Sequence, residues 1–529
     1  MIERVLENWL INASERAFQA PFCQVLVNQG YTVVHLTRHC SMEMGKDIIA
    51  VAPDGTPTAF QLKATGSKKV SKDEWRTVLL PQIEELVTQA IDHPAIDANK
   101  THHPVLVING ELEEEAQVAI KQYNESLRRR KFSKTARLKV IVRGQLLRMF
   151  LELGENLIPS ELKDEKSLLE LYLMKGHETF PKKQFADLLE SILPLTDSTI
   201  SKPGQGRAMT AAAIVTALAL SAFNRASNHV ASFEAWTIFC SYILCLAEKR
   251  RMAEKQWKPV FQLGCEAILK SLEDLSEELA SSQRYVVGDP VADVPFYRIR
   301  ITHLAGLMAL LGLWSETCGR NNEEERLFIS KCLPILSLWG EYAVPQFLAI
   351  YFFLGRFDAT LKRTHFLGGV LAGIAKLGSD AHEKYLLPGP EVDPEEFVLD
   401  THIRQENERR FSYKRGSATI VGLLHLFARY NLKQSVRCLW PEISRVQQKV
   451  FIPSDRSDCY RWHIERGREH SVYPQPTQSW AALTKEAEEH SGDDLPKLLK
   501  KYPVFCLAFL MVYPHRFSPS LVRWLDTVL

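Results

Sequence analysis

A stretch of nineteen residues, from Gly45 to Lys63, sets the tightest limit on how this chain folds. It reads GKDIIAVAPDGTPTAFQLK, with runs rich in Ile, Val, Ala, Phe and Thr on both sides of Pro53-Asp54-Gly55. Such runs flanking a turn signal indicate a β-hairpin. Pro favours the second position of a type I turn and Gly the left-handed position, which predicts a three-residue loop with a bulge.

The loop length determines which residues face each other across the hairpin. If Ala52 pairs with Thr56, then Asp47 lies directly opposite Gln61, and Lys63 follows on the same face because side chains alternate along a strand. The intervening residues of the second strand then point into a core: Thr58, Phe60 and Leu62. A two-residue loop would instead turn Asp47 to the opposite face, so the prediction depends on the turn type.

A carboxylate, an amide and a lysine on one sheet face are costly to bury without a use. Their chemistry suits phosphodiester hydrolysis with a hard divalent cation. Mg²⁺ takes a few protein oxygens and keeps waters, so Asp47, a backbone carbonyl near Leu62 and Gln61 are candidate ligands for Mg²⁺ or Mn²⁺. Lys63 would position or deprotonate the attacking water and offset the charge that grows on the phosphate.

The chain contains three motifs in order: a helix glutamate, Gly-x-Asp and Gln-x-Lys. They are Glu15, Gly45-Lys46-Asp47 and Gln61-Leu62-Lys63. Glu15 lies fifteen residues before Gly30-Tyr31. This pattern resembles the Mrr-like branch of the restriction-endonuclease superfamily, over roughly residues 10 to 150. The resemblance implies a metal-dependent nuclease whose catalytic residues are Glu15, Asp47, Gln61 and Lys63. It also implies that Glu15 joins Asp47 and Gln61 around the metal.

The helix that carries Glu15 contains a proline. Residues 14 to 29 have apolar residues at helical spacing, and Glu15 falls on the same inward face. Pro21 inside this segment would remove a hydrogen bond and clash with the preceding turn. Either the helix runs through Pro21 with Glu15 facing the sheet, or it begins near Pro21 and Glu15 lies elsewhere.

The elements up to residue 153 are expected in the order α-β-β-β-α-β-α-β-α. This is the order of a restriction-endonuclease-like α/β core, a mixed sheet flanked by helices. After the first helix come a strand at Tyr31 to Thr37, the hairpin, a helix at Asp73 to Ile91, a strand at Pro104 to Asn109, a helix at Glu111 to Leu127, a strand at Leu138 to Val142 and a helix at Gly144 to Leu153.

Basic residues cluster near the candidate site and would neutralise phosphates of a nucleic acid. They are Lys68, Lys69 and Lys72 after the hairpin and Arg128, Arg129 and Arg130 after the third helical segment. The arginine run equally fits a solvated helix end, because cations are favourable there. The net charge of +2 gives no bulk attraction to DNA, so any nucleic-acid surface is a local patch.

A chain of 529 residues is too long for one core, so we expect two to four domains. Residues 1 to 155 form the expected nuclease domain. Residues 156 to 529 read as a large all-α region, with a division near residues 285 to 295 as one option. Within it, the stretch from Cys459 to His470 is expected to be a polar surface helix.

We expect a cytoplasmic protein with no membrane association. The ten cysteines contain no CxxC pair, which indicates reduced thiols, and Cys240 and Cys245 are expected in the core. The chain opens without a signal-peptide pattern, and the longest apolar runs fall short of the roughly 20 residues of a membrane span.

The leading hypothesis is an Mg²⁺-dependent DNA endonuclease controlled or targeted by its helical region. Cutting both strands would require two active sites, so a homo-oligomer is expected in that case. Mrr-like domains recur in restriction and anti-phage systems, and a bacterial defence role is implied by the resemblance alone. Two alternatives stay open: a catalytically degenerate subunit whose helical region binds a protein partner, and a nuclease that cuts RNA.

Overall fold

The computed structural model describes residues 2–36, 46–65, 69–91, 93–97, 100–129, 137–152, 162–195, 201–281, 295–317, 319–357, 361–378, 387–390, 392–394, 397, 416–453, 455–462, 468–472, 476–489 and 495–529. The chain divides into two compact units, Met1–Lys270 and Ser271–Leu529, which are described separately. The first unit therefore joins the sheet to the first helices of the helical region. The nuclease domain of residues 1 to 155 stays a prediction, and the optional division near 285 to 295 lies almost entirely outside the described residues.

A five-stranded mixed sheet forms the centre of the first unit. Its order is β1-β2-β3-β5-β7, antiparallel from β1 to β3 and parallel from β3 to β7. The strands are β1 (Thr32–Leu36), β2 (Ile48–Val51), β3 (Pro57–Lys63), β5 (His103–Ile108) and β7 (Lys139–Ile141). The expected mixed sheet near the N-terminus is confirmed.

The hairpin between β2 and β3 has the predicted register. The Ala52 N–H donates to the Thr56 carbonyl at 2.9 Å, and Ile48 lies opposite Phe60. Gly55 has a φ of +82°, the left-handed conformation that this loop requires. The Asp47 N–H donates to the Phe60 carbonyl at 2.8 Å, so the pairing continues to the residue that precedes β2.

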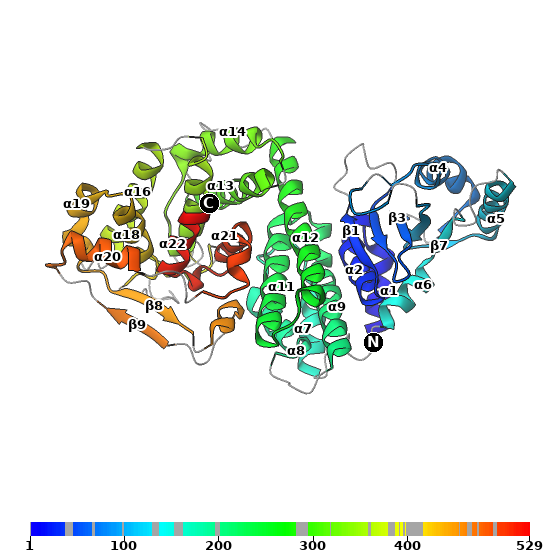
Figure 1. Cartoon of the computed structure of the whole chain (residues 1–529), viewed down its shortest axis with the longest axis horizontal. Coiled ribbons are helices and arrows are strands. Elements are labelled where there is room, and N and C mark those ends of the chain that lie inside the picture. Colours follow the sequence, from blue (N-terminus) through cyan, green and yellow to red (C-terminus); the bar gives the residue numbers. More distant parts are fainter. Residues whose placement is uncertain are drawn as a thin grey trace. The chain divides into compact units, whose positions relative to one another are not determined.

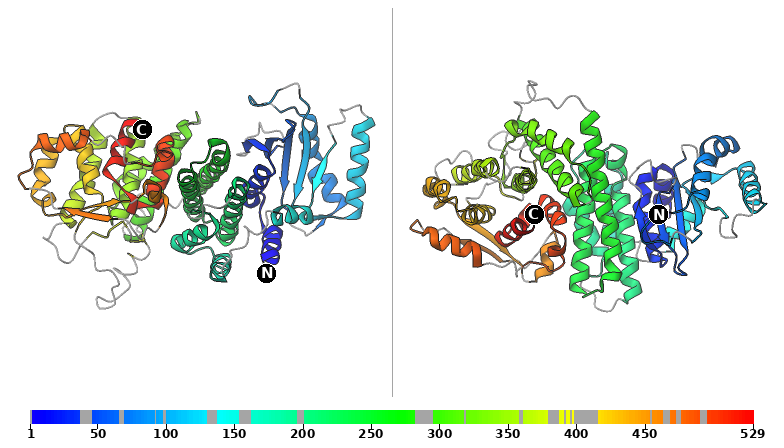
Figure 2. Two further views of the ribbon diagram at one scale, coloured as in Figure 1. Left: turned by 60° about the horizontal axis from the view of Figure 1, so that its bottom comes forward. Right: turned by 45° about the horizontal axis from the view of Figure 1, so that its top comes forward.

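Helices cover both faces of this sheet (Figure 2). On one face lie α2 (Glu15–Asn28) and α6 (Arg143–Leu151), and on the other lie α4 (Leu80–Thr88) and α5 (Glu114–Arg129). The short α3 (Lys72–Glu74) and a π-helical turn (Trp75–Leu79) lead into α4. Two elements were not anticipated as such: α1 (Ile2–Asn12), and a two-stranded parallel sheet of β4 (Lys69–Val70) and β6 (Glu111–Leu112).

Helix α2 is continuous through Pro21, which settles the question that the sequence left open. Ser14 caps its first turn by accepting the Ala17 N–H at 3.3 Å, so the helix begins at Glu15. The helix is buried on the sheet side and on the far side, where it packs against α9 (Lys202–Ala219) (Figure 1). Burial on both sides stabilises a helix that has lost one backbone hydrogen bond to proline.

The remaining helices of the first unit are α7 (Leu162–Tyr172), α8 (Lys182–Ile192), α10 (Ser221–Arg225), α11 (His229–Lys249) and the first part of α12 (Glu254–Ser281). Cys240 and Cys245 are fully buried in α11, as expected. Among the described residues, α11 is the one helix long and apolar enough to cross a membrane, and 94% of its most apolar window is buried in the protein's own interior.

The second unit is largely helical. Its longer helices are α13 (Pro295–Thr317), α14 (Glu323–Cys332), α15 (Val344–Leu354), α16 (Leu361–Gly378), α18 (Ile420–Arg429), α19 (Lys433–Ile443), α20 (Trp480–Glu489), α21 (Pro503–Val512) and α22 (Pro519–Val528).

The expectation that residues 156 to 529 are all-α is wrong at one place. Strands β8 (Gln448–Ile452) and β9 (Arg468–Val472) form an antiparallel pair. The expected polar helix from Cys459 to His470 is also wrong, because a 3₁₀ turn ends at Tyr460 and His470 lies in β9. The strand-forming run KVFI is short, and its partner follows after a long connection, so no local turn signal marks the pair.

Candidate active site

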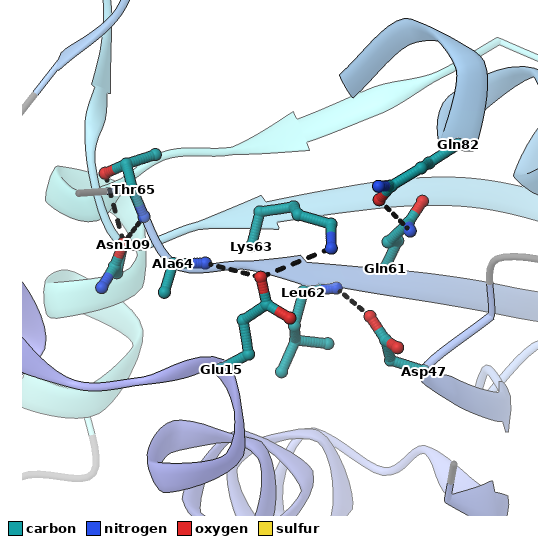
Figure 3. Close-up of polar contacts among 9 residues, drawn as sticks. All are labelled: Glu15, Asp47, Gln61, Leu62, Lys63, Ala64, Thr65, Gln82 and Asn109. Carbon is teal, nitrogen blue, oxygen red and sulfur yellow. Dashed lines mark hydrogen bonds and ion pairs between the residues drawn. The ribbon is translucent and has the colours of Figure 1, made fainter. Parts of the chain in front are cut away.

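Glu15 and Lys63 meet at the end of strand β3 (Figure 3). The Lys63 ammonium lies 3.4 Å from Glu15 Oε1, and the Ala64 N–H donates to the same oxygen at 3.2 Å. The two side chains are 20% and 34% exposed, so the pair is accessible to a substrate. The first residue of α2 therefore reaches the end of β3.

Asn109, which sequence reasoning did not single out as a site residue, holds this arrangement together. It follows β5 and is 2% exposed. Its side-chain N–H groups donate to the carbonyls of Leu10 and Ala13, each at 2.9 Å, and its Oδ1 accepts the Thr65 N–H at 2.9 Å. One amide thus ties the connection before Glu15 to the end of β3 (Figure 3).

Asp47 lies between β3 and α2. Its Oδ2 accepts the Leu62 N–H at 2.6 Å, and its backbone carbonyl accepts Gln19 Nε2 at 3.2 Å. Gln19 is four residues after Glu15, so both project from the same face of α2. Asp47 is preceded by the buried Lys46, whose pKa is lowered by burial and raised, to a smaller extent, by Glu85.

Gln61 is 4% exposed and has an orphaned oxygen. Its Nε2 donates to Oε1 of Gln82, on α4, at 3.1 Å, while its own Oε1 is buried and has no hydrogen-bond partner among the described residues. An unsatisfied buried acceptor costs about 1–3 kcal/mol. Because Gln82 fixes the amide nitrogen, the oxygen is directed elsewhere and is suited to a cation.

The donor set fits Mg²⁺ or Mn²⁺. Magnesium is held by one or two carboxylates and keeps several waters. Glu15 and Asp47 supply two carboxylates, and the Gln61 oxygen lacks any other partner in the described part of the chain. No group of three or more His, Cys, Asp or Glu residues suited to a metal occurs among the described residues.

The expected nucleic-acid-binding residues fall in two places. Lys69 lies in β4 and Lys72 in α3, where its ammonium is 3.4 Å from Glu115 at the start of α5. Arg128 and Arg129 are exposed in the last turn of the same helix, about 20 Å away at 1.5 Å per residue. Lys68 and Arg130 lie outside the described residues. The two clusters thus do not form one continuous patch.

No known protein-family model, curated protein or solved structure matches the chain. The assignment of a function therefore depends on the residues themselves. Glu15 and Lys63 pair at the carboxyl end of β3, Asp47 accepts the Leu62 N–H beside them, and the Gln61 amide turns toward Gln82 on α4 (Figure 3).

Three residues at the site were missed by sequence reasoning: Gln19, Gln82 and Asn109. Only Gln19 carried a usable signal, since it lies one helical turn after Glu15.

Proposed function

We propose that this chain is a metal-dependent endonuclease that hydrolyses phosphodiester bonds in DNA. The observation that carries the proposal is the Glu15–Lys63 ion pair at the end of β3, with the Asp47 carboxylate held by the backbone N–H of Leu62, the residue before Lys63. The Gln61 oxygen is buried without a donor among the described residues, so it is available to a cation or to an ordered water. A restriction-endonuclease-like fold of the Mrr type is part of this proposal.

We assign Lys63 a direct role in the reaction, in contact with the attacking water and the phosphate. Its ammonium lies at a partly exposed strand end, where it can hold the attacking water and stabilise the charge that develops on the phosphate oxygens. Glu15 keeps this ammonium in place through their ion pair, and the Ala64 N–H fixes the carboxylate in turn. The lysine is therefore preorganised before substrate binds.

Glu15, Asp47 and Gln61 are the residues that would hold Mg²⁺ or Mn²⁺. The bound ion would polarise the scissile phosphate and lower the pKa of a coordinated water. The chain itself positions the ligands: the Leu62 N–H donates to the Asp47 carboxylate, and the side-chain oxygen of Gln82 accepts a hydrogen bond from Gln61 Nε2. The first contact comes from the backbone of β3 and the second from a side chain on α4.

The helical region is proposed to control or target the nuclease, in a defence role against foreign DNA. Support comes from the contact between α2, which carries Glu15, and α9. An RNA substrate is the second candidate, because the residues that cut do not select the sugar. A catalytically degenerate binding subunit is the third, favoured by Gln61 where a carboxylate would add a negative charge to the site.

The test is cleavage of supercoiled plasmid and of single-stranded RNA by the full chain, with Mg²⁺, Mn²⁺ or EDTA. Lys63→Ala and Asp47→Asn are expected to lower cleavage by at least a hundredfold, since each removes a charged group used in the transition state. The matched controls are Lys121→Ala and Asp187→Asn, which change exposed residues on α5 and α8. Both controls should cut as the unchanged protein does.

Each outcome has a definite meaning. DNA cleavage that needs the metal and is lost only in the site variants supports the endonuclease. Cleavage of RNA alone reassigns the substrate. Full activity of folded Lys63→Ala contradicts the assigned role, and absence of both cleavage and Mn²⁺ binding by calorimetry favours the degenerate subunit.

A further inference from the structure

A polar cavity opens on the sheet away from the candidate active site. It has a volume of about 590 Å³ and lies between the end of α2, helix α6 and the sheet face, where β3, β5 and β7 begin. Ligand pockets for small molecules span roughly 300–1,000 Å³, so this volume admits a compact organic ligand. Phe60, Val105 and Leu26 provide an apolar part of the lining.

Three cations lie in the polar part of this lining. Arg137, Lys139 and Arg148 come from the segment before β7, from β7 itself and from α6. None of the three forms an ion pair among the described residues, and all three are exposed. Like charges gathered without partners repel each other, and this repulsion is relieved when an anion binds between them.

The carboxylate in the lining does not neutralise this charge. Asp54 is the one acid among the described lining residues, and its Oδ1 accepts the Thr56 N–H at 2.9 Å within the hairpin loop. This hydrogen bond is the main cause that lowers the pKa of Asp54 from its ordinary value. A single acid thus faces three permanent cations, and the cavity keeps a net positive charge.

The cavity is separate from the candidate active site. Phe60 is the lining residue of β3 nearest to Lys63 and lies three residues before it, which corresponds to about 10 Å at about 3.3 Å per residue. Side chains alternate along the strand, so Phe60 and Lys63 point to opposite faces of the sheet. A ligand in the cavity would not touch Glu15, Asp47 or Lys63.

We propose that this cavity binds a free nucleoside phosphate. The phosphate groups would lie against Arg137, Lys139 and Arg148, since guanidinium groups bind phosphate oxygens through paired hydrogen bonds. The base would lie against the partly exposed Tyr31 and Met149 of the lining, with Gln29 and Gln145 available for its polar edge. A lone phosphate ion would leave the apolar part of a cavity of 590 Å³ unused.

The test is isothermal titration calorimetry of the full chain with the nucleoside mono- and triphosphates, adenosine and inorganic phosphate. At least one nucleotide should bind, and Arg148→Gln or Lys139→Gln should weaken it by about tenfold or more. Arg225→Gln and Lys121→Gln are matched controls at exposed cations outside the cavity, and they should leave binding unchanged. Lys63→Ala should also bind normally, which separates this proposal from the nuclease.

Four results would overturn the proposal. The first is that no nucleotide binds at millimolar concentration. The second is that Arg148→Gln and Lys139→Gln leave nucleotide binding intact. The third is that inorganic phosphate or adenosine binds as tightly as any nucleotide. The fourth is a single-stranded oligonucleotide that binds through Arg148 and Lys139 more tightly than every mononucleotide. That result would assign the cavity to a nucleic-acid strand.

Discussion

Replacing Asn109 by alanine tests how the fold positions Glu15. The substitution removes three hydrogen bonds of 2.9 Å, to Leu10, Ala13 and Thr65, from a side chain that is 2% exposed. At about 1 kcal/mol for each bond, the sheet should lose about 3 kcal/mol of stability. Since 1.4 kcal/mol corresponds to a factor of ten, amides of the sheet should exchange roughly a hundredfold faster.

The assay is hydrogen exchange of β3 and β5 followed by mass spectrometry, because a chain of two units need not unfold in one step. Asn124→Ala is the matched control. Its side chain bridges α5 to Leu138 by two bonds of 2.9 and 3.1 Å but contacts neither Leu10 nor Ala13. If the proposed function holds, Asn109→Ala should also lose cleavage at temperatures where it stays folded, whereas Asn124→Ala should keep it. Unchanged exchange in Asn109→Ala would refute the reasoning.

Three further perturbations have definite expected results. Lys182→Met should destabilise the first unit by about 3–5 kcal/mol, because Glu234 is left as a buried charge without its ion pair of 2.9 Å. In chemical denaturation, the double variant Lys182→Met/Glu234→Leu should recover most of this loss. Gln82→Ala should weaken Mn²⁺ binding about tenfold in calorimetry by freeing the Gln61 amide to turn, whereas the exposed Gln89→Ala should not. Burial lowers the pKa of His102, so the unfolded state binds a proton more readily than the folded state as the pH falls below about 6.5. The stability of the sheet should therefore fall below this pH. His102→Gln should remove this contribution to the pH dependence of unfolding.

The hairpin was predictable because its information is local. The residues that set the register are Pro53, Asp54 and Gly55, and the observed loop, pairing and left-handed glycine all follow from them. Strands β8 and β9 were not predictable in this way. Each is five residues long, and their pairing depends on segments that no short turn joins.

In the candidate site, too, local sequence information placed some residues and not others. Asp47, Gln61 and Lys63 could be placed from the hairpin register, and Glu15 from the helix pattern and the family resemblance. The supporting side chains of Gln82 and Asn109 could not be placed from the sequence, because their partners are distant along the chain. Gln82 is 21 residues from Gln61. Asn109 is 96 residues from Ala13 and 99 from Leu10. Such contacts exist only once the sheet has brought the segments together.

The position of α2 shows how the helical region could influence catalysis without contacting substrate. The helix presents Glu15 and Gln19 to the site, while Gln24 Nε2 donates to the Val260 carbonyl of α12 at 3.4 Å. Its far side packs against α9, so a displacement of α9 or α12 must either move α2 or open a buried interface. Misplacement of a catalytic group by about 1 Å can cost a hundredfold in rate. If the proposed function holds, a small shift of these helices is sufficient to separate an active from an inactive arrangement of Glu15 and Lys63.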